Sequence, residues 1–202
     1  GNMLTAFGAF MFAANGNIRF DILIAMLTGL ALVIASGCVF NNYIDQGIDA
    51  RMKRTSKRAL VVGSVSEKGA LIFGSLLLIV GGSLLGIFTN IPTLLVALFG
   101  FFSYVVMYGI WKRKSVHGTE VGSISGAIPP VVGYIAVTGS LDITSGILFI
   151  LLVLWQMPHF YAIGIFRLRE YKAAGLPVLP VVKGTVLAKR YIVFYVLAYT
   201  AA

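Results

Sequence analysis

The sequence predicts an all-α protein, a polytopic transmembrane helical bundle, on the strength of its composition and its long apolar runs. Hydrophobic residues make up 58% of the chain and charged residues only 11%, whereas a soluble domain carries about 25% charged residues. Apolar runs approaching the roughly 20 residues that cross a bilayer recur along the chain. Because backbone groups in lipid must satisfy their hydrogen bonds internally, we expect these runs to be helices.

The apolar runs predict five complete helices and two partial ones in a single domain that covers residues 1–202. The complete spans are expected at Ile22–Ile44, Gly69–Phe88, Ile91–Ile110, Val121–Val137 and Ile143–Phe166. Gly1–Ala14 and Tyr191–Ala202 are apolar but too short to cross the membrane alone. Since Gly1–Ala14 lacks a basic leading segment, we interpret it as the rear part of a helix rather than a signal peptide. The sequence is expected to be truncated at both ends.

The basic residues predict how the helices are oriented. Of the 16 Lys and Arg residues, all except Arg19 lie in the stretches 51–68, 112–114 and 167–190. These stretches follow alternate spans, so they emerge on one side of the membrane, which the positive-inside rule identifies as the cytoplasm. The net charge of +9 is therefore a topology feature, and no soluble domain remains to present a basic face to nucleic acid. The single cysteine, Cys38, lies within an apolar run and excludes a disulfide framework.

Polar residues at the end of the first complete span form the best candidate site. Asn41, Asp45 and Asp49 are spaced four apart, so they share one face of a helix. Asp near the centre of a membrane helix costs about 2.5–3.5 kcal/mol and is usually functional. Two carboxylates and a carboxamide suit Mg²⁺, which often binds through one or two carboxylates plus substrate phosphates. The alternative is a helix end that emerges into water.

Two basic segments favour a site for a polyanion. The cluster Arg51–Arg58 directly follows the acidic residues, although an ordinary positive-inside loop would look the same. Tyr108 and Lys112 lie one helical turn apart at another basic helix end. There Lys112 could neutralise a leaving diphosphate to which Tyr108 donates a hydrogen bond. An interface tyrosine and a snorkelling lysine are the alternative.

The segment Trp155–Tyr161 is the third candidate site. Pro158 is expected to interrupt the helical hydrogen bonds and allow irregular backbone around a cavity. His159 is an intramembrane histidine, which is a functional candidate by default, although a core histidine bonded to a neighbouring helix is equally typical. We expect the run Ser123–Pro130 to serve mainly close helix packing through its small residues.

In this order the motifs resemble the intramembrane prenyltransferases of the UbiA type. The Asn-x-x-x-Asp-x-x-x-Asp motif of that family corresponds to Asn41, Asp45 and Asp49, and its Tyr-x-x-x-Lys motif to Tyr108 and Lys112. Longer stretches are similar to the branch of the family that farnesylates protohaem: Ala35–Asp45 running into Arg54–Arg58, Gly122–Tyr134, and Trp155–His159 followed by Gly175–Val182.

The resemblance implies transfer of a farnesyl group from farnesyl diphosphate to a vinyl group of protohaem IX (haem B). It implies Mg²⁺ held by Asn41, Asp45 and Asp49, with haem B as a substrate rather than a cofactor. The implied catalytic residues are Asp45, Asp49, Tyr108 and Lys112. The implied substrate-binding residues are Asn41, Asn42, Arg54, Arg58, Trp155, Gln156, His159, Arg167 and Arg169. Such an enzyme is expected in a bacterial inner membrane, in contact with lipid and with a terminal oxidase assembly or a downstream haem-modifying enzyme.

The sequence departs from the family pattern in two places. The family's second motif is Asp-x-x-x-Asp ahead of a glycine. With that glycine at Gly175, its acidic positions hold Arg167 and Tyr171, and Glu170 is the only acid nearby. A Lys-Pro element at the start and about two helices at the end of the family are also absent. We therefore expect the loop that carries Arg167, Glu170 and Tyr171 to bind a substrate anion rather than a second metal ion. The alternative is that its basic residues only set the topology.

Other functions remain open from the sequence. Another UbiA-type enzyme would prenylate a quinone precursor or a different tetrapyrrole, and the Trp155–His159 stretch favours haem over these. A secondary transporter also places acids at broken helices, but here the acids gather at one membrane face. A structural subunit of an oxidase would not need the polar face of Asn41, Asp45 and Asp49.

Overall fold

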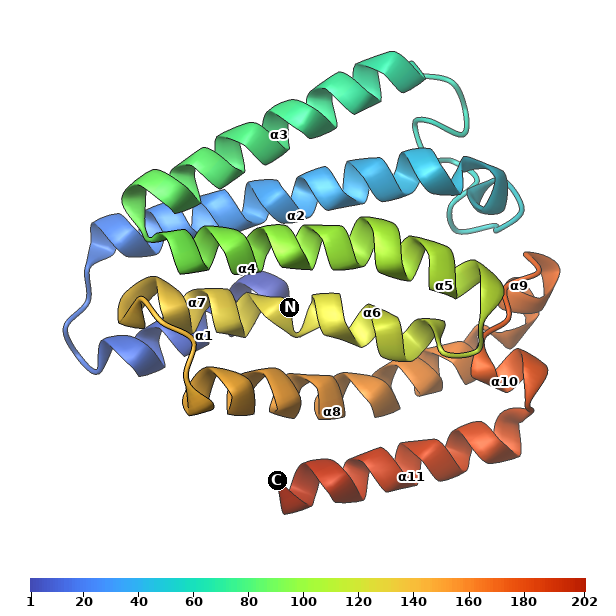
Figure 1. Cartoon of the computed structure of the whole chain (residues 1–202). Helices are drawn as coiled ribbons and strands as arrows, with labels where there is room; N and C mark the ends of the chain where they lie inside the picture. The colour runs from blue at the N-terminus through green and yellow to red at the C-terminus, as the bar shows by residue number, and fades with distance from the viewer.

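The computed structural model describes residues 1–202 and is built from helices alone (Figure 1). Five rods are long and apolar enough to cross a membrane. They are α2 (Phe20–Asp49), α3 (Glu67–Phe88), the continuous rod Ile91–Lys114, the helix pair Gly118–Thr138, and α8 (Ile143–Phe166). The shorter apolar helix α1 (Asn2–Ala14) and the C-terminal helix α11 (Thr185–Ala201) complete the bundle. The prediction of a transmembrane helical bundle with five complete spans is confirmed.

Successive rods run antiparallel, so the connections gather at two opposite ends of the bundle (Figure 1). One end holds residues 50–66, the turn at 115–117, and the two short helices α9 (Leu168–Ala173) and α10 (Leu179–Val182). The other end holds the short loops 15–19, 89–90 and 139–142. The three basic stretches therefore lie at the same end, as the charge pattern predicted.

Small residues bring neighbouring helices into close contact. A Cβ atom added at Gly81 of α3 would lie 2.7 Å from the carbonyl oxygen of Gly29 on α2, so only glycine allows this crossing. One end of the same interface is fixed by the hydroxyl of Ser36, which donates to the Gly74 carbonyl oxygen at 2.7 Å. In lipid there is no hydrophobic drive between helices, so association depends on such close packing and on interhelical hydrogen bonds.

The rod Ile91–Lys114 changes its winding as it approaches the basic end. It starts as α4 (Ile91–Phe102), continues as the π-helical turn η1 (Ser103–Tyr108) and ends as α5 (Gly109–Lys114). Single π turns inside α-helices occur frequently at functional sites. Here the wider turn changes which side chains of the rod face the centre of the bundle.

The structure shows one helix break that was not predicted and corrects one that was. The run 123–130, expected mainly to pack helices, ends α6 (Gly118–Gly126) and starts α7 (Ile128–Thr138). Pro129 and Pro130 lie in the first turn of α7, where a missing N–H has no helical partner to lose. The expected interruption at Pro158 is wrong, because α8 continues through it from Ile143 to Phe166. A single proline removes one hydrogen bond, and the neighbouring turns hold the helix together.

Candidate active site

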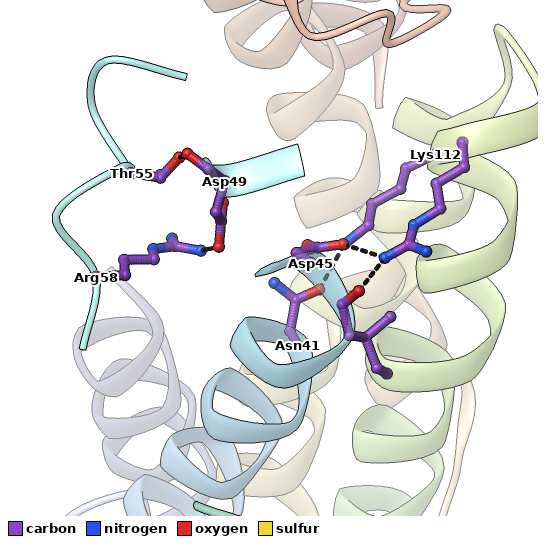
Figure 2. Close-up of polar contacts among 8 residues, drawn as sticks. Asn41, Asp45, Asp49, Thr55, Arg58 and Lys112 are labelled. Carbon is purple, nitrogen blue, oxygen red and sulfur yellow. Dashed lines mark hydrogen bonds and ion pairs between the residues drawn. The ribbon is translucent and has the colours of Figure 1, made fainter. Parts of the chain in front are cut away.

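Asn41, Asp45 and Asp49 form one buried face at the end of α2, which we call the acidic stripe (Figure 2). Their exposed fractions are 7%, 7% and 4%. The spacing of four residues therefore places all three side chains inward, as predicted from the sequence. Buried carboxylates are unfavourable unless they are paired with cations, and each of the two has a basic partner.

Asp45 lies between two cations supplied by α5. Lys112 forms an ion pair with Asp45. Its ammonium nitrogen also donates to the side-chain oxygen of Asn41 at 2.5 Å. Arg113 donates to the other carboxylate oxygen of Asp45 at 2.7 Å and to the Ile44 carbonyl oxygen at 2.5 Å. Thus α2 supplies the carboxylate of Asp45 and α5 supplies the cation Lys112, although the two residues are more than sixty positions apart in the chain (Figure 2).

Asp49 is paired with the loop that follows its own helix. The guanidinium of Arg58 lies 2.6 Å from a carboxylate oxygen of Asp49. The loop folds back toward α2 because the buried hydroxyl of Thr55 donates to the Asp49 backbone carbonyl at 3.0 Å. The same carbonyl, at the end of the helix, also accepts the backbone N–H of Met52 at 3.2 Å. The basic loop therefore does more than set topology, since it contributes a cation to the acidic stripe.

Two tyrosines extend from the charged cluster into the bundle. The Lys112 ammonium nitrogen lies 4.9 Å from the centre of the Tyr108 ring. The rings of Tyr104 and Tyr108 are nearly parallel, with an interplanar angle of 12° and centroids 5.8 Å apart. Both residues lie in η1, where the wider turn stacks side chains four residues apart. The Lys112 ammonium group, the Tyr108 ring and the Tyr104 ring are therefore stacked in this order.

A cavity of about 420 Å³ opens beneath the charged cluster, within the range of about 300–1,000 Å³ typical of small-molecule sites. Four rods line it, and Lys112 belongs both to its wall and to the ion pairs with the acidic stripe. The lining is mainly apolar or small. It includes Leu30, Ile34, Cys38, Ala97, Gly100, Phe101, Tyr104, Tyr108, Gly122, Gly126, Ile128, Gln156, Phe160, Tyr161, Tyr171 and Leu176.

The face of α8 that lines the cavity carries Gln156, Phe160 and Tyr161. His159 is exposed on another face of the helix, where its ring stacks on that of Trp155 with centroids 5.5 Å apart. Trp155 lines a shallower groove outside the cavity instead. The prediction that His159 lies on the cavity side is therefore wrong for this cavity, because at about 100° per residue its side chain points about 100° away from that of its lining neighbour Phe160. Its role toward haem stays a prediction.

The remaining predicted residues lie at the basic end but outside the ion-paired cluster. Asn42 is half-buried beside the acidic stripe, and Arg54 is exposed on the loop that carries Arg58. Arg167 lies 3.5 Å from Glu170, with both side chains about one-third exposed, and Arg169 is exposed. Their roles toward a substrate stay predictions.

No specific role was predicted for several residues of the site, although Tyr161 lies in the candidate segment Trp155–Tyr161. Arg113 follows Lys112 in a positively charged helix end, so nothing in the pattern distinguished it from a topology residue. Tyr161 donates to the carboxylate of Glu120 at 2.7 Å and fixes α8 against α6. Gly122 could have been recognised, because glycines one turn apart mark a helix face that a bulky group approaches. A Cβ atom there would lie 3.0 Å from the Tyr108 ring.

The acidic stripe fits a magnesium ion that is shared with a phosphate ligand. Its side chains offer two carboxylates and a carboxamide oxygen, the hard donors that Mg²⁺ takes. Nowhere in residues 1–202 do three His, Cys, Asp or Glu side chains converge. The neighbouring cations Lys112, Arg113 and Arg58 suit a polyanion rather than a bare cation. The donor set is therefore compatible with a metal ion that is shared with a phosphate ligand.

Comparison with known proteins decides the family. A profile described as the UbiA prenyltransferase family matches residues 2–202. The chain belongs to this family. It is 48% identical over 200 residues to a protein named protoheme IX farnesyltransferase from Protochlamydia amoebophila, covering 99% of this chain and 71% of that one. It is 54% identical over 203 residues to protoheme IX farnesyltransferase 2 from Chromobacterium violaceum, covering 100% and 67%.

Solved structures support the same fold at low sequence identity. A UbiA homolog from Archaeoglobus fulgidus bound to GPP and Mg²⁺ superposes with a TM-score of 0.75 at 17% identity, over 98% of this chain and 70% of that one. The apo structure of a UbiA homolog from Aeropyrum pernix K1 gives 0.77 at 21% identity, over 98% and 75%. The helices of this UbiA family member thus take the arrangement of a UbiA-type bundle.

Proposed function

We propose that this protein transfers a farnesyl group from farnesyl diphosphate to a vinyl group of haem B, giving haem O. One observation carries the proposal: a cluster of buried acids and cations caps an apolar cavity, and Lys112 belongs to both. A prenyl diphosphate has the matching polarity, with a highly charged head and an apolar tail. The choice of haem as acceptor rests on identity of about half the residues to relatives named protoheme IX farnesyltransferase.

The diphosphate head is expected to exchange the ion pairs of the resting site for its own. Lys112, Arg113 and Arg58 already lie beside the carboxylates and can turn their donors toward phosphate oxygens. Asn41, Asp45 and Asp49 would hold Mg²⁺, which when bound neutralises charge on the leaving diphosphate. With the leaving group stabilised in this way, the C–O bond of the prenyl donor can ionise.

The cavity is expected to protect the allylic cation that ionisation leaves behind. Its walls are mainly apolar, so water has few partners there. The stacked faces of Tyr104 and Tyr108 lie directly below Lys112 and can stabilise positive charge through their ring electrons. A haem vinyl carbon then forms the new C–C bond, and water adds to the resulting cation and releases a proton. The product is the hydroxyethylfarnesyl side chain.

The acceptor is expected to approach from the basic end. The segment after α8 borders the cavity through Tyr171 and Leu176 and carries Arg167 and Arg169 close by. An arginine fork can pair with a haem propionate or with phosphate, so we propose that one of these two contacts a substrate anion. Gln156, a buried amide on the cavity wall, is the polar group best placed to contact the acceptor.

The decisive experiment supplies membranes containing the full chain with farnesyl diphosphate, Mg²⁺ and haem B, and detects farnesylated haem by mass. Product is expected with these membranes and not with membranes containing the Asp45→Asn variant. Prenylation of a quinone precursor without prenylation of haem would move the protein to another UbiA-type reaction. Consumption of neither acceptor would contradict the proposal.

We also propose that the basic end faces the cytoplasm of a bacterial inner membrane. The support is the gathering of the three basic stretches at one end of the bundle. Single cysteines placed at Lys57 and Lys183, in a Cys38→Ser background, should react only with reagents that enter the cell. Labelling of either site from outside intact cells would contradict this orientation. We further expect the product to pass to a terminal oxidase assembly or to a downstream haem-modifying enzyme.

A further inference from the structure

The cavity has a charged end and a mainly apolar end, which we call its mouth and its floor, and the exposed residue Asn2 also lines it. Lys112 and Tyr108 line its upper part, and Leu30, Ala97 and Ile128 line the part farthest from them along the rods. Fifteen residues separate Lys112 from Ala97 on one continuous rod, a rise of about 22 Å at 1.5 Å per residue. The lining is therefore a long slot rather than a round pocket.

The floor is rigid because it belongs to the main hydrophobic core. Leu30, Ala97 and Ile128 are 1%, 2% and 5% exposed. They pack in one cluster with Met26 and Val132, which are fully buried below them. Protein interiors packed at this density transmit strain rather than yield to an extra methylene. A chain that runs along the slot from the mouth therefore meets tightly packed side chains at Leu30, Ala97 and Ile128.

The space above the floor depends on small side chains of α4. Ala97 contributes only a methyl group at this level. Gly100, one turn closer to the mouth, lies so near Ile128 that a Cβ atom there would be 2.8 Å from its methyl carbon. A larger residue at position 97 has no free volume in the packed core, so it would have to extend into the slot.

The geometry points to Ala97, together with Leu30 and Ile128, as the residues that set the longest prenyl chain the protein accepts. This inference rests on the proposed function only in assuming that a prenyl diphosphate binds with its head at Lys112. Shortening the slot should then penalise a three-isoprene chain and spare a two-isoprene chain. A mismatch of even one methylene in an apolar pocket changes discrimination by about 10- to 200-fold.

The test measures donor binding without requiring turnover. Cys38 is the only cysteine of the chain and lines the cavity, so bound donor should slow its reaction with a maleimide. Half-protecting concentrations of geranyl and farnesyl diphosphate, each with Mg²⁺, are compared in wild type, Ala97→Leu and Ala97→Phe. The matched control is Leu95→Phe, an enlargement on the outer face of the same helix, where Leu95 is 59% exposed.

Both Ala97 variants are expected to need roughly tenfold more farnesyl diphosphate or more, with geranyl diphosphate changed less than about twofold. The Leu95→Phe control should match wild type with both donors. Equal losses for the two donors, unchanged protection in both Ala97 variants, or no protection by any donor would each overturn the inference. Haem farnesylation, measured separately, fails or succeeds independently of this result and tests the proposed function alone.

Discussion

Aspartates lie at both ends of the bundle, and their surroundings differ completely. At the end opposite the basic one, Asp21 pairs with Arg19 with both side chains about two-thirds exposed, an arrangement that contributes little to stability. At the basic end, Asp45 and Asp49 are almost fully buried among three cations. Buried ion pairs seldom repay their desolvation, so their retention at one end indicates a functional site.

Asp142, also at the end opposite the basic one, shows a third environment. Its side chain accepts the Ser145 backbone N–H at 2.9 Å and the Tyr134 hydroxyl at 2.8 Å, which caps α8. These bonds, led by the backbone N–H of Ser145, hold the pKa of Asp142 below its ordinary value. The cap is therefore present above the ordinary aspartate pKa and is lost as the pH falls through the lowered one. Asp142 thus caps a helix, whereas Asp45 pairs with two cations from a distant helix.

The largest expected effect comes from neutralising the acidic stripe. Asp45→Asn and Asp49→Asn should each lower the rate of haem farnesylation by at least about 100-fold, the loss typical of removing an electrostatic catalytic group. Asp21→Asn at the other end should stay within about twofold of wild type. Membrane insertion and melting temperature are measured for all three. Activity within about threefold of wild type in both stripe variants would remove the basis of the proposed site.

The pairing partners of the stripe could be predicted only in part. Spacing of four placed Asn41, Asp45 and Asp49 on one face, because a helix imposes that geometry. The spacing could not predict that Lys112, rather than another of the basic residues, forms an ion pair with Asp45. That contact depends on how two distant helices pack, which no local pattern contains. The prediction that His159 lines the cavity was wrong for a related reason. The helix around it is apolar on all sides, so the sequence does not indicate which face points inward.

A second prediction separates two cations that share one carboxylate. Lys112 and Arg113 both pair with Asp45, but only Lys112 lines the cavity. Lys112→Met should therefore lower kcat/KM for farnesyl diphosphate by about 10- to 100-fold, and Arg113→Met by about tenfold or less. Steady-state kinetics at saturating haem give both values. Equal losses would mean that position relative to the cavity does not matter and that the two act only as a charge pair for Asp45.

A smaller effect is expected from the loop after α8. Arg167→Ala and Arg169→Ala should raise the KM for one substrate by about three- to tenfold while kcat changes little, as expected for uniform binding. A raised KM for farnesyl diphosphate identifies phosphate as the anion, and a raised KM for haem identifies the propionates. Lys183→Ala, in the same basic segment, serves as the control. No change in any variant would assign the loop to topology alone.

The smallest effect is expected at His159, and α8 itself provides the comparison. Gln156 is buried on the cavity wall, whereas His159 is exposed and stacked on Trp155. If the cavity is where haem reacts, Gln156→Leu should weaken haem binding by about three- to tenfold, the cost of losing one buried hydrogen bond. By the same reasoning His159→Ala should leave haem affinity and the Soret band unchanged. Titrating haem into each purified variant measures both the haem affinity and the Soret band. A shifted Soret band in His159→Ala alone would instead mean that haem binds the outer face of α8, and that the wall of the cavity belongs to the prenyl donor only.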